Sequence, residues 1–395
     1  MSGWQPDHTY VASSGFFPRN FDQRLRHDCC TAASKLFHRP YVPAPMSVSS
    51  ASRRQWLYRW AGLAALSGLP ASATAQLSEP DELLRIAVGA RGTLYHLPLL
   101  AAQELGFFAD EGLKVQIDDH PSGAAAVQAL ATGRADVCCG GYEHVMRGQL
   151  HGQDWRSLVL LARAPQIALL TSAKLQRNED LARLRPLRVG VTAPGSSTHY
   201  LASLWLQQAG LDEHPVQFVA VGSGAAAVEA LRHGRVHALC HADPVLTLLE
   251  QRTSVRVLAD TRSLKGSAQM YGGTMPGGCL FAPQYFVQRR PRQTQALANA
   301  MVRALRWLQT ASVTDLARLV PKPYLLGDRG AYLAAFEKVR ETLSPDGTMP
   351  ADGPATALRA VQRMQPMALA QTRVLLEKTY SDTWARKARE KIERV

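Results

Sequence analysis

The feature that most constrains this 395-residue chain is a segment that it contains twice. SGAAAVQALATGR occupies 122–134 and SGAAAVEALRHGR occupies 223–235, with exchanges at three positions only. In each copy a serine precedes small and apolar residues and a glycine follows them, which predicts a helix capped by Ser122 or Ser223. Two copies are too few for a solenoid, so the duplication predicts two similar halves.

The duplication extends upstream of these helices. LRIAVGARGTLYHLPLLAAQELG (84–106) matches LRVGVTAPGSSTHYLASLWLQQAG (187–210), and each reads as an apolar strand, a loop with glycine and a hydroxyl residue, and a helix. A second strand, the repeated helix and a third strand follow in both halves, so the order predicts right-handed βαβ units and parallel sheets. We therefore expect an α/β chain with two similar lobes and a ligand cleft where the strand ends face each other.

The N-terminal region resembles an export signal. SRRQWL (52–57), a short apolar run (61–70) and ATA (73–75) have the order of a signal peptide, which we place at 46–75. The Arg53-Arg54 pair resembles the twin-arginine signal, although Trp56 stands where Phe is usual; an ordinary secretory signal is the alternative. Since such a signal starts a chain, we expect 1–45 to be a non-native, disordered extension and the protein to be periplasmic.

Composition narrows the ligand class. The net charge is +13, which favours anionic ligands. The cations are scattered among acidic residues and form no basic stripe, which argues against nucleic-acid binding. Cys138, Cys139, Cys240 and Cys279 have no zinc-site spacing and read mostly as buried thiols. No GxSxG, GxxxxGK[ST] or HExxH motif occurs, so we expect no enzyme, no cofactor and no metal site.

The strongest local signal for a ligand is the turn at 194–199. A helix N-terminus offers unpaired N–H groups and a partial positive charge, and three hydroxyl residues here exceed what a helix cap needs. Plain capping is the alternative. The turn contributes these candidate ligand-binding residues: Gly195, Ser196, Ser197, Thr198 and His199.

Further candidates follow the other strands that point at the cleft. Tyr95 either stacks on a planar ligand or packs in its own lobe, His241 can meet an anion or a hydrogen-bonding ring, and Asp243 can instead be an N-cap. The complete additional set is Thr93, Tyr95, His96, Gly140, Gly141, Tyr142, His241 and Asp243.

Three stretches carry a resemblance to a known family. AAQELGFFADEGLKVQI (101–117), ALATGRADV (129–137) and PGSSTHY (194–200) resemble ABC-transporter solute-binding proteins of the nitrate, sulfonate, taurine and thiamine-precursor type. The resemblance implies a bilobed periplasmic-binding-protein fold, type II-like, with additional C-terminal helices. The chain would cross over and return, so that 83–172 and 263–395 form lobe 1 and 173–262 form lobe 2.

The resemblance also implies partners. We expect a monomer that binds a sulfonate, carboxylate or pyrimidine-like solute, with its polar headgroup at the turn 194–199, and delivers it to an ABC permease in the inner membrane. Two alternatives remain. One is an enzyme of thiamine-pyrimidine synthesis, whose cysteine-rich motif Cys138-Cys139 does not reproduce. The other is a ligand sensor for a membrane receptor.

Overall fold

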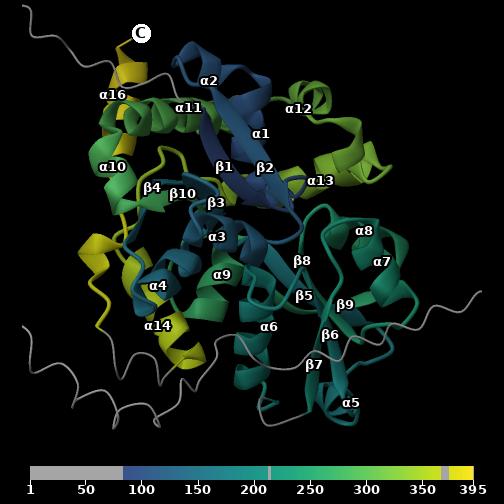
Figure 1. Cartoon of the computed structure of the whole chain (residues 1–395). Helices are drawn as coiled ribbons and strands as arrows, with labels where there is room; N and C mark the ends of the chain where they lie inside the picture. Colours follow the sequence, from purple (N-terminus) through teal and green to yellow (C-terminus); the bar gives the residue numbers. More distant parts are fainter. Residues whose placement is uncertain (1–82, 212–214, 366–372, 395) are drawn as a thin grey trace, which may run out of the picture. The chain divides into compact units, whose positions relative to one another are not determined.

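The computed structural model describes residues 83–211, 215–365 and 373–394. These residues form two five-stranded sheets with helices around them (Figure 1). The predicted extension at 1–45 and the predicted signal peptide at 46–75 lie outside the described residues. Within the described part of the chain, no helix is both long enough and apolar enough to cross a membrane.

The first sheet has the strand order β2-β1-β3-β10-β4 and defines lobe 1. Its strands β1, β2 and β3 run parallel, whereas β10 is antiparallel to both of its neighbours. The bounds are β1 Leu84–Gly89, β2 Val115–His120, β3 Val137–Gly141, β4 Trp155–Leu160 and β10 Gly278–Pro283. Between them lie α1 Leu97–Glu104, α2 Phe107–Asp110, α3 Gly123–Ala131 and α4 Tyr142–Leu150.

The second sheet has the order β7-β6-β8-β5-β9 and defines lobe 2. Here β5 is the antiparallel strand, paired with β8 and β9. The strands are β5 Ile167–Ser172, β6 Leu187–Val191, β7 Val216–Ala220, β8 Ala238–Ala242 and β9 Val255–Asp260. The helices are α5 Asn178–Ala182, α6 Ser197–Gln208, α7 Ala225–Arg232 and α8 Val245–Arg252.

The two sheets have the same topology, because β1, β2, β3 and β4 occupy the places of β6, β7, β8 and β9. The expected duplication is therefore present in three dimensions. Two details differ from the prediction. Each sheet is mixed and not purely parallel, and the strand 167–172, which we had assigned to lobe 1, belongs to the second sheet. The reason is that β5 and β10 are the crossing segments, and each enters its new sheet antiparallel.

The repeated helices occupy equivalent places but begin differently. Ser122 caps α3 by accepting a hydrogen bond from the amide of Ala125, as predicted. The N-cap of α7 is Gly224, and it makes no side-chain cap bond, so the expected cap at Ser223 is wrong. The same sequence is thus set in two different local surroundings.

The C-terminal helices complete lobe 1 and reach lobe 2. The long helix α11 (Pro291–Thr310) packs on α1, α2 and β4, and its buried Leu297 and Met301 join the core of the first sheet. Burial of one such side chain contributes roughly 2 kcal/mol. Helix α14 (Gly353–Met364) contacts both α4 and α6, and therefore both lobes. The remaining α-helices of the described residues are α9 Leu264–Tyr271, α10 Gln284–Arg289, α12 Val313–Leu319, α13 Arg329–Val339 and α16 Thr383–Glu393.

Candidate functional site

A cavity lies where the carboxyl ends of the strands in the two lobes meet, and we call it the His144 cavity. Eight of the residues predicted from the sequence line it: Thr93, Tyr95, His96, Gly140, Gly141, Ser196, Ser197 and Thr198. Its other lining residues are Gly89, Ala90, Gly123, His144, Ile167, Thr192 and Ala242. The cavity has an empty volume of about 430 Å³, open solvent at its mouth included.

Close backbone packing brings the start of α3 into this cavity. A Cβ atom on Gly89, at the end of β1, would lie 2.3 Å from the amide nitrogen of Gly123. Only glycine permits this approach. The starts of α3 and α6 both line this cavity, through Gly123 and through Ser196, the N-cap of α6.

The hydroxyl groups at the start of α6 are used mainly for contacts outside their own helix. Ser196 makes no cap bond in α6; its Oγ accepts from the amide of Ala124 in lobe 1, at 3.3 Å. The Ser197 hydroxyl donates to the Glu143 carboxylate, also in lobe 1. Thr198 Oγ1 accepts from the Thr192 amide at 3.0 Å. Plain capping therefore does not account for the three hydroxyls, and two of them join the lobes.

His144 is the buried polar group that sequence reasoning missed. Its side chain is 2% exposed, and burial lowers its imidazole pKa to about 4. Nδ1 lies 3.5 Å from the Arg147 guanidinium, which is always a donor, so the neutral ring carries its proton on Nε2. Among the described residues, Nε2 has no hydrogen-bond partner. An unpaired N–H donor therefore lines the cavity, and the only sequence signal was a histidine soon after paired glycines at a strand end.

His96 lines the cavity and contacts the buried thiol of Cys139, but this pair is not an activated nucleophile. His96 Nδ1 lies 3.4 Å from Cys139 Sγ, which resembles a catalytic pair in distance alone. Burial lowers the pKa of His96 to about 4 and raises the pKa of Cys139 to about 12. Both groups are therefore neutral near pH 7, and a neutral thiol is a weak nucleophile.

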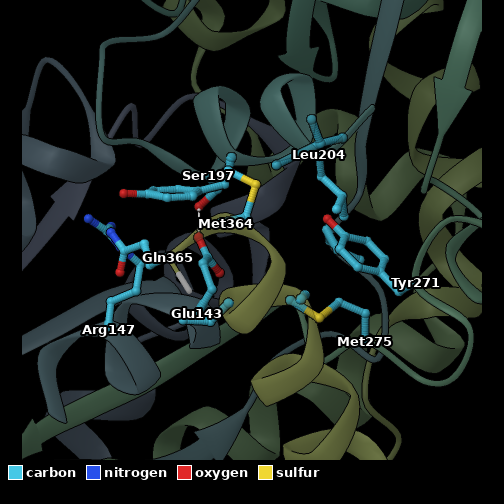
Figure 2. Close-up of a pocket in the computed structure, with 13 residues that line it drawn as sticks. Glu143, Arg147, Ser197, Leu204, Tyr271, Met275, Met364 and Gln365 are labelled. Atoms are coloured by element: carbon cyan, nitrogen blue, oxygen red, sulfur yellow. Dashed lines mark hydrogen bonds between the residues drawn. The ribbon is translucent and has the colours of Figure 1, made fainter. Parts of the chain in front are cut away.

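A second cavity adjoins the first, and we call it the Glu143 cavity (Figure 2). The two cavities share Ile167 and Ser197. Glu143 and Arg147 supply the charges, and the Arg147 guanidinium lies 4.0 Å from the centre of the Tyr200 ring. The remaining lining residues are mostly apolar or aromatic: Pro165, Tyr200, Leu204, Tyr271, Met275, Ala360, Val361, Met364 and Gln365. Because the second cavity includes residues of α14, motif analysis of the duplicated halves could not have found it.

Five predicted residues line neither cavity: Tyr142, Gly195, His199, His241 and Asp243. The Tyr142 hydroxyl is paired with Thr379, and His199 accepts from the Gly195 amide while packing on Phe218.

The other three of these residues, Gly195, His241 and Asp243, belong to lobe 2 and are also paired within the protein. The Gly195 carbonyl accepts from Arg147, and the ring nitrogens of His241 face the carbonyls of Ala242 and Gly222. Asp243 accepts from the Thr247 amide in the first turn of α8 and pairs with Arg262, although the N-cap of that helix is Pro244 and not Asp243. Each of the five thus has at least one hydrogen-bond partner within the protein.

Comparisons with known proteins bear on the family and the fold of this chain. The NMT1-like family matches residues 79–320. A solved structure of a protein from Bordetella bronchiseptica RB50 is 43% identical and has a TM-score of 0.75, covering 79% of this chain and 99% of that one. The periplasmic aliphatic sulphonate binding protein SsuA from Escherichia coli has a TM-score of 0.55 at 20% identity, covering 77% and 99%, and confirms the predicted fold.

A curated relative has an enzyme's name. The chain is 28% identical over 107 residues to 4-amino-5-hydroxymethyl-2-methylpyrimidine phosphate synthase from Uromyces fabae. The match covers 27% of this chain and 31% of that enzyme. The chain thus matches about a third of the length of this relative.

Proposed function

Because the chain belongs to the NMT1-like family, we propose that it is the exported substrate-binding component of an ABC importer. In this role it binds a small anionic or polar organic solute between its lobes in the periplasm, as a monomer, and delivers it to an inner-membrane permease. The twin-arginine-like sequence at 46–75 supports export. The sulphonate-binding function named for the E. coli neighbour supports a sulfonate, carboxylate or pyrimidine-like ligand.

The observation that carries the proposal is the unpaired donor of His144 beside converging helix starts. Gly123 of α3, the α4 N-cap Gly141 and the α6 N-cap Ser196 all line the His144 cavity. Each helix start carries a partial positive charge, although the α3 amides of Ala124 and Ala125 already bond to Ser196 and Ser122. With His144 Nε2–H added, the cavity offers donors that suit the oxygens of an anion or of a polar headgroup.

Lobe closure supplies the switch that an importer needs. The contacts Ala124–Ser196 and Glu143–Ser197 join the lobes directly across the cavities. A ligand that touches both walls gains its full set of contacts only when the lobes are shut, so it stabilises the closed state. A permease can then distinguish loaded from empty protein by shape.

The match to the Uromyces enzyme favours one alternative, a pyrimidine-synthesis enzyme. Against it, Cys138, Cys139 and Cys279 are buried thiols, and burial raises the pKa of each of them. Binding needs no activated nucleophile, whereas covalent catalysis by these residues would need a thiolate.

A melting-shift screen tests the proposal. Sulfonates, carboxylates and pyrimidines are added to the purified protein, and a ligand present at a hundred times its Kd should stabilise it by about 2.7 kcal/mol. The double variant Ser196→Ala with Ser197→Ala should lose this response. Ser203→Ala is the matched control, because its hydroxyl bonds to the His199 carbonyl of its own helix. An unchanged response in the double variant would refute the site, and no response to any compound would refute the function.

A further inference from the structure

Glu143 is a buried carboxylate that the binding of an anion does not use. It is the second residue of α4, its side chain is 10% exposed, and it lines the Glu143 cavity. Gly141 leaves room for it, since a Cβ atom there would lie 2.2 Å from Glu143 Oε2. The fold therefore reserves space for this carboxylate beside the ligand cavities.

The protein satisfies only part of what this carboxylate can accept. A carboxylate has about four acceptor positions on two oxygens. In the described part of the chain, Glu143 accepts a hydrogen bond from the Ser197 hydroxyl. His144 Nε2 lies farther away, at 3.7 Å from Glu143 Oε1. A carboxylate in a largely apolar cavity is costly unless donors surround it.

Arg147, one turn further along α4, does not fill the remaining positions. Its guanidinium bonds to the Gly195 carbonyl, lies near His144 Nδ1, and stacks on the Tyr200 ring. Its charge offsets that of Glu143 at a distance. The acceptor positions of the carboxylate therefore remain available to whatever enters the cavity.

We infer that the ligand carries an N–H group that donates a hydrogen bond to Glu143. This inference rests on the proposed function and adds the chemical class of the ligand, which is an amino-bearing acid or an aminated heterocycle. Its acceptor end lies in the His144 cavity, and its N–H end lies in the Glu143 cavity. Ser197, whose hydroxyl bonds to Glu143 (Figure 2), is shared by both cavities. Tyr200, Tyr271 and Met275 cover the ligand's apolar part.

Matched pairs of probes test the inference by calorimetry. The first pair is 2-aminoethanesulfonate and 1-propanesulfonate, and the second is 2-methylpyrimidin-4-amine and 2,4-dimethylpyrimidine. Within each pair a methyl replaces the amino group at nearly constant size. In at least one pair the amino compound should bind at least about tenfold tighter, because a hydrogen bond to a charged group is among the stronger ones.

The variant Glu143→Gln should lower that ratio, since the amide replaces one of the two carboxylate oxygens by an N–H donor and removes the charge that strengthens the hydrogen bond. Glu390→Gln on the exposed side of α16 is the matched control and should keep the wild-type ratio. The wild-type comparison needs no variant, so it remains decisive even if Glu143→Gln folds poorly.

Two results would overturn the inference. One is equal binding of the methyl and amino compounds, or a ratio that survives in Glu143→Gln. The other is a solute without an N–H donor that binds in the melting-shift screen while none of the four probes does; the proposed function would then stand. If no compound in that screen binds, it is the proposed function that fails.

Discussion

The starts of α4 and α8 occupy equivalent places in the two lobes, after β3 and β8, and their chemistry is opposite. In lobe 1, His144 has a ring nitrogen with no partner in the described residues, and Glu143 lines a cavity. In lobe 2, Asp243 is 1% exposed and is matched by Arg262, which also pairs with Glu250 and Asp260. The polar groups that follow β3 in lobe 1 thus keep hydrogen-bonding positions that no described residue fills, and they can bind a ligand, whereas those that follow β8 in lobe 2 are paired and stabilise the fold. The two lobes nevertheless have the same topology.

The repeated helices α3 and α7 teach the same lesson. Gly123 at the start of α3 lines the His144 cavity, whereas Ser223 and Gly224 before α7 line a different cavity with Pro323 and Tyr324. Nearly identical sequences therefore make the same helix, and the groups that face each helix start decide whether it can contact the ligand.

The largest expected effect is on the free energy of unfolding, where a substitution of Arg262 should cost far more than one of Glu143. Arg262→Met leaves Asp243 buried without its cation, and burial already raises the pKa of that carboxyl against the effect of Arg262. We expect a loss of about 3–5 kcal/mol in the free energy of unfolding, as for other broken buried pairs. Glu143→Gln should change it by less than about 1 kcal/mol. Urea unfolding of the two ligand-free variants measures both free energies. Equal losses would contradict the difference that we draw between the two lobes.

A smaller effect should appear as the pH falls. His96 and His144 have folded-state pKa values of about 4, against 6.5 for ordinary histidine, because both are buried. Below pH 6.5 the unfolded chain binds protons that the folded protein cannot, so stability is lost between pH 6.5 and 4, by roughly 3 kcal/mol for each ring.

His144→Asn should remove its share of that loss, as followed by unfolding at pH 7, 5 and 4. Replacing the exposed His151 by Gln serves as the control and should leave the profile unchanged. A wild-type slope in His144→Asn would mean that the ring is charged, and not an unpaired neutral donor, in the folded protein.

The smallest effect concerns two glycines that begin the repeated helices. A Cβ on Gly123 would lie 3.6 Å from His144 Nε2 and 4.0 Å from Ser196 Oγ, which the fold tolerates but which fills space in the cavity. Gly123→Ala should weaken ligand binding about tenfold, or about 1.4 kcal/mol. A Cβ on Gly224 would meet no atom within 4 Å apart from its chain neighbours, so Gly224→Ala should leave affinity unchanged. Calorimetry with a ligand from the screen would show the reverse order if the ligand bound near α7.

Much of the fold follows from the sequence because the chain repeats its strand, loop and helix signals in order. The positions of the crossing strands β5 and β10 could not be predicted in this way. Their antiparallel pairing depends on which sheet the connecting segment reaches in the folded chain. The hydroxyls at 196–198 were predictable from local chemistry alone. The roles of His144 and Glu143 were not predictable, because they depend on which hydrogen-bond partners the folded chain places beside these side chains. The part of α14 in the Glu143 cavity was not predictable either, because this helix lies more than 150 residues away from Glu143 in the sequence.

The most direct test of the account is a crystal structure with the tightest ligand from the screen. We predict a ligand between the lobes, with acceptor oxygens at the start of α3 and at His144 Nε2, and an N–H group at the Glu143 carboxylate. A ligand seated instead in the cavity formed by Ser223, Gly224 and Tyr324, with the His144 cavity empty, would contradict it.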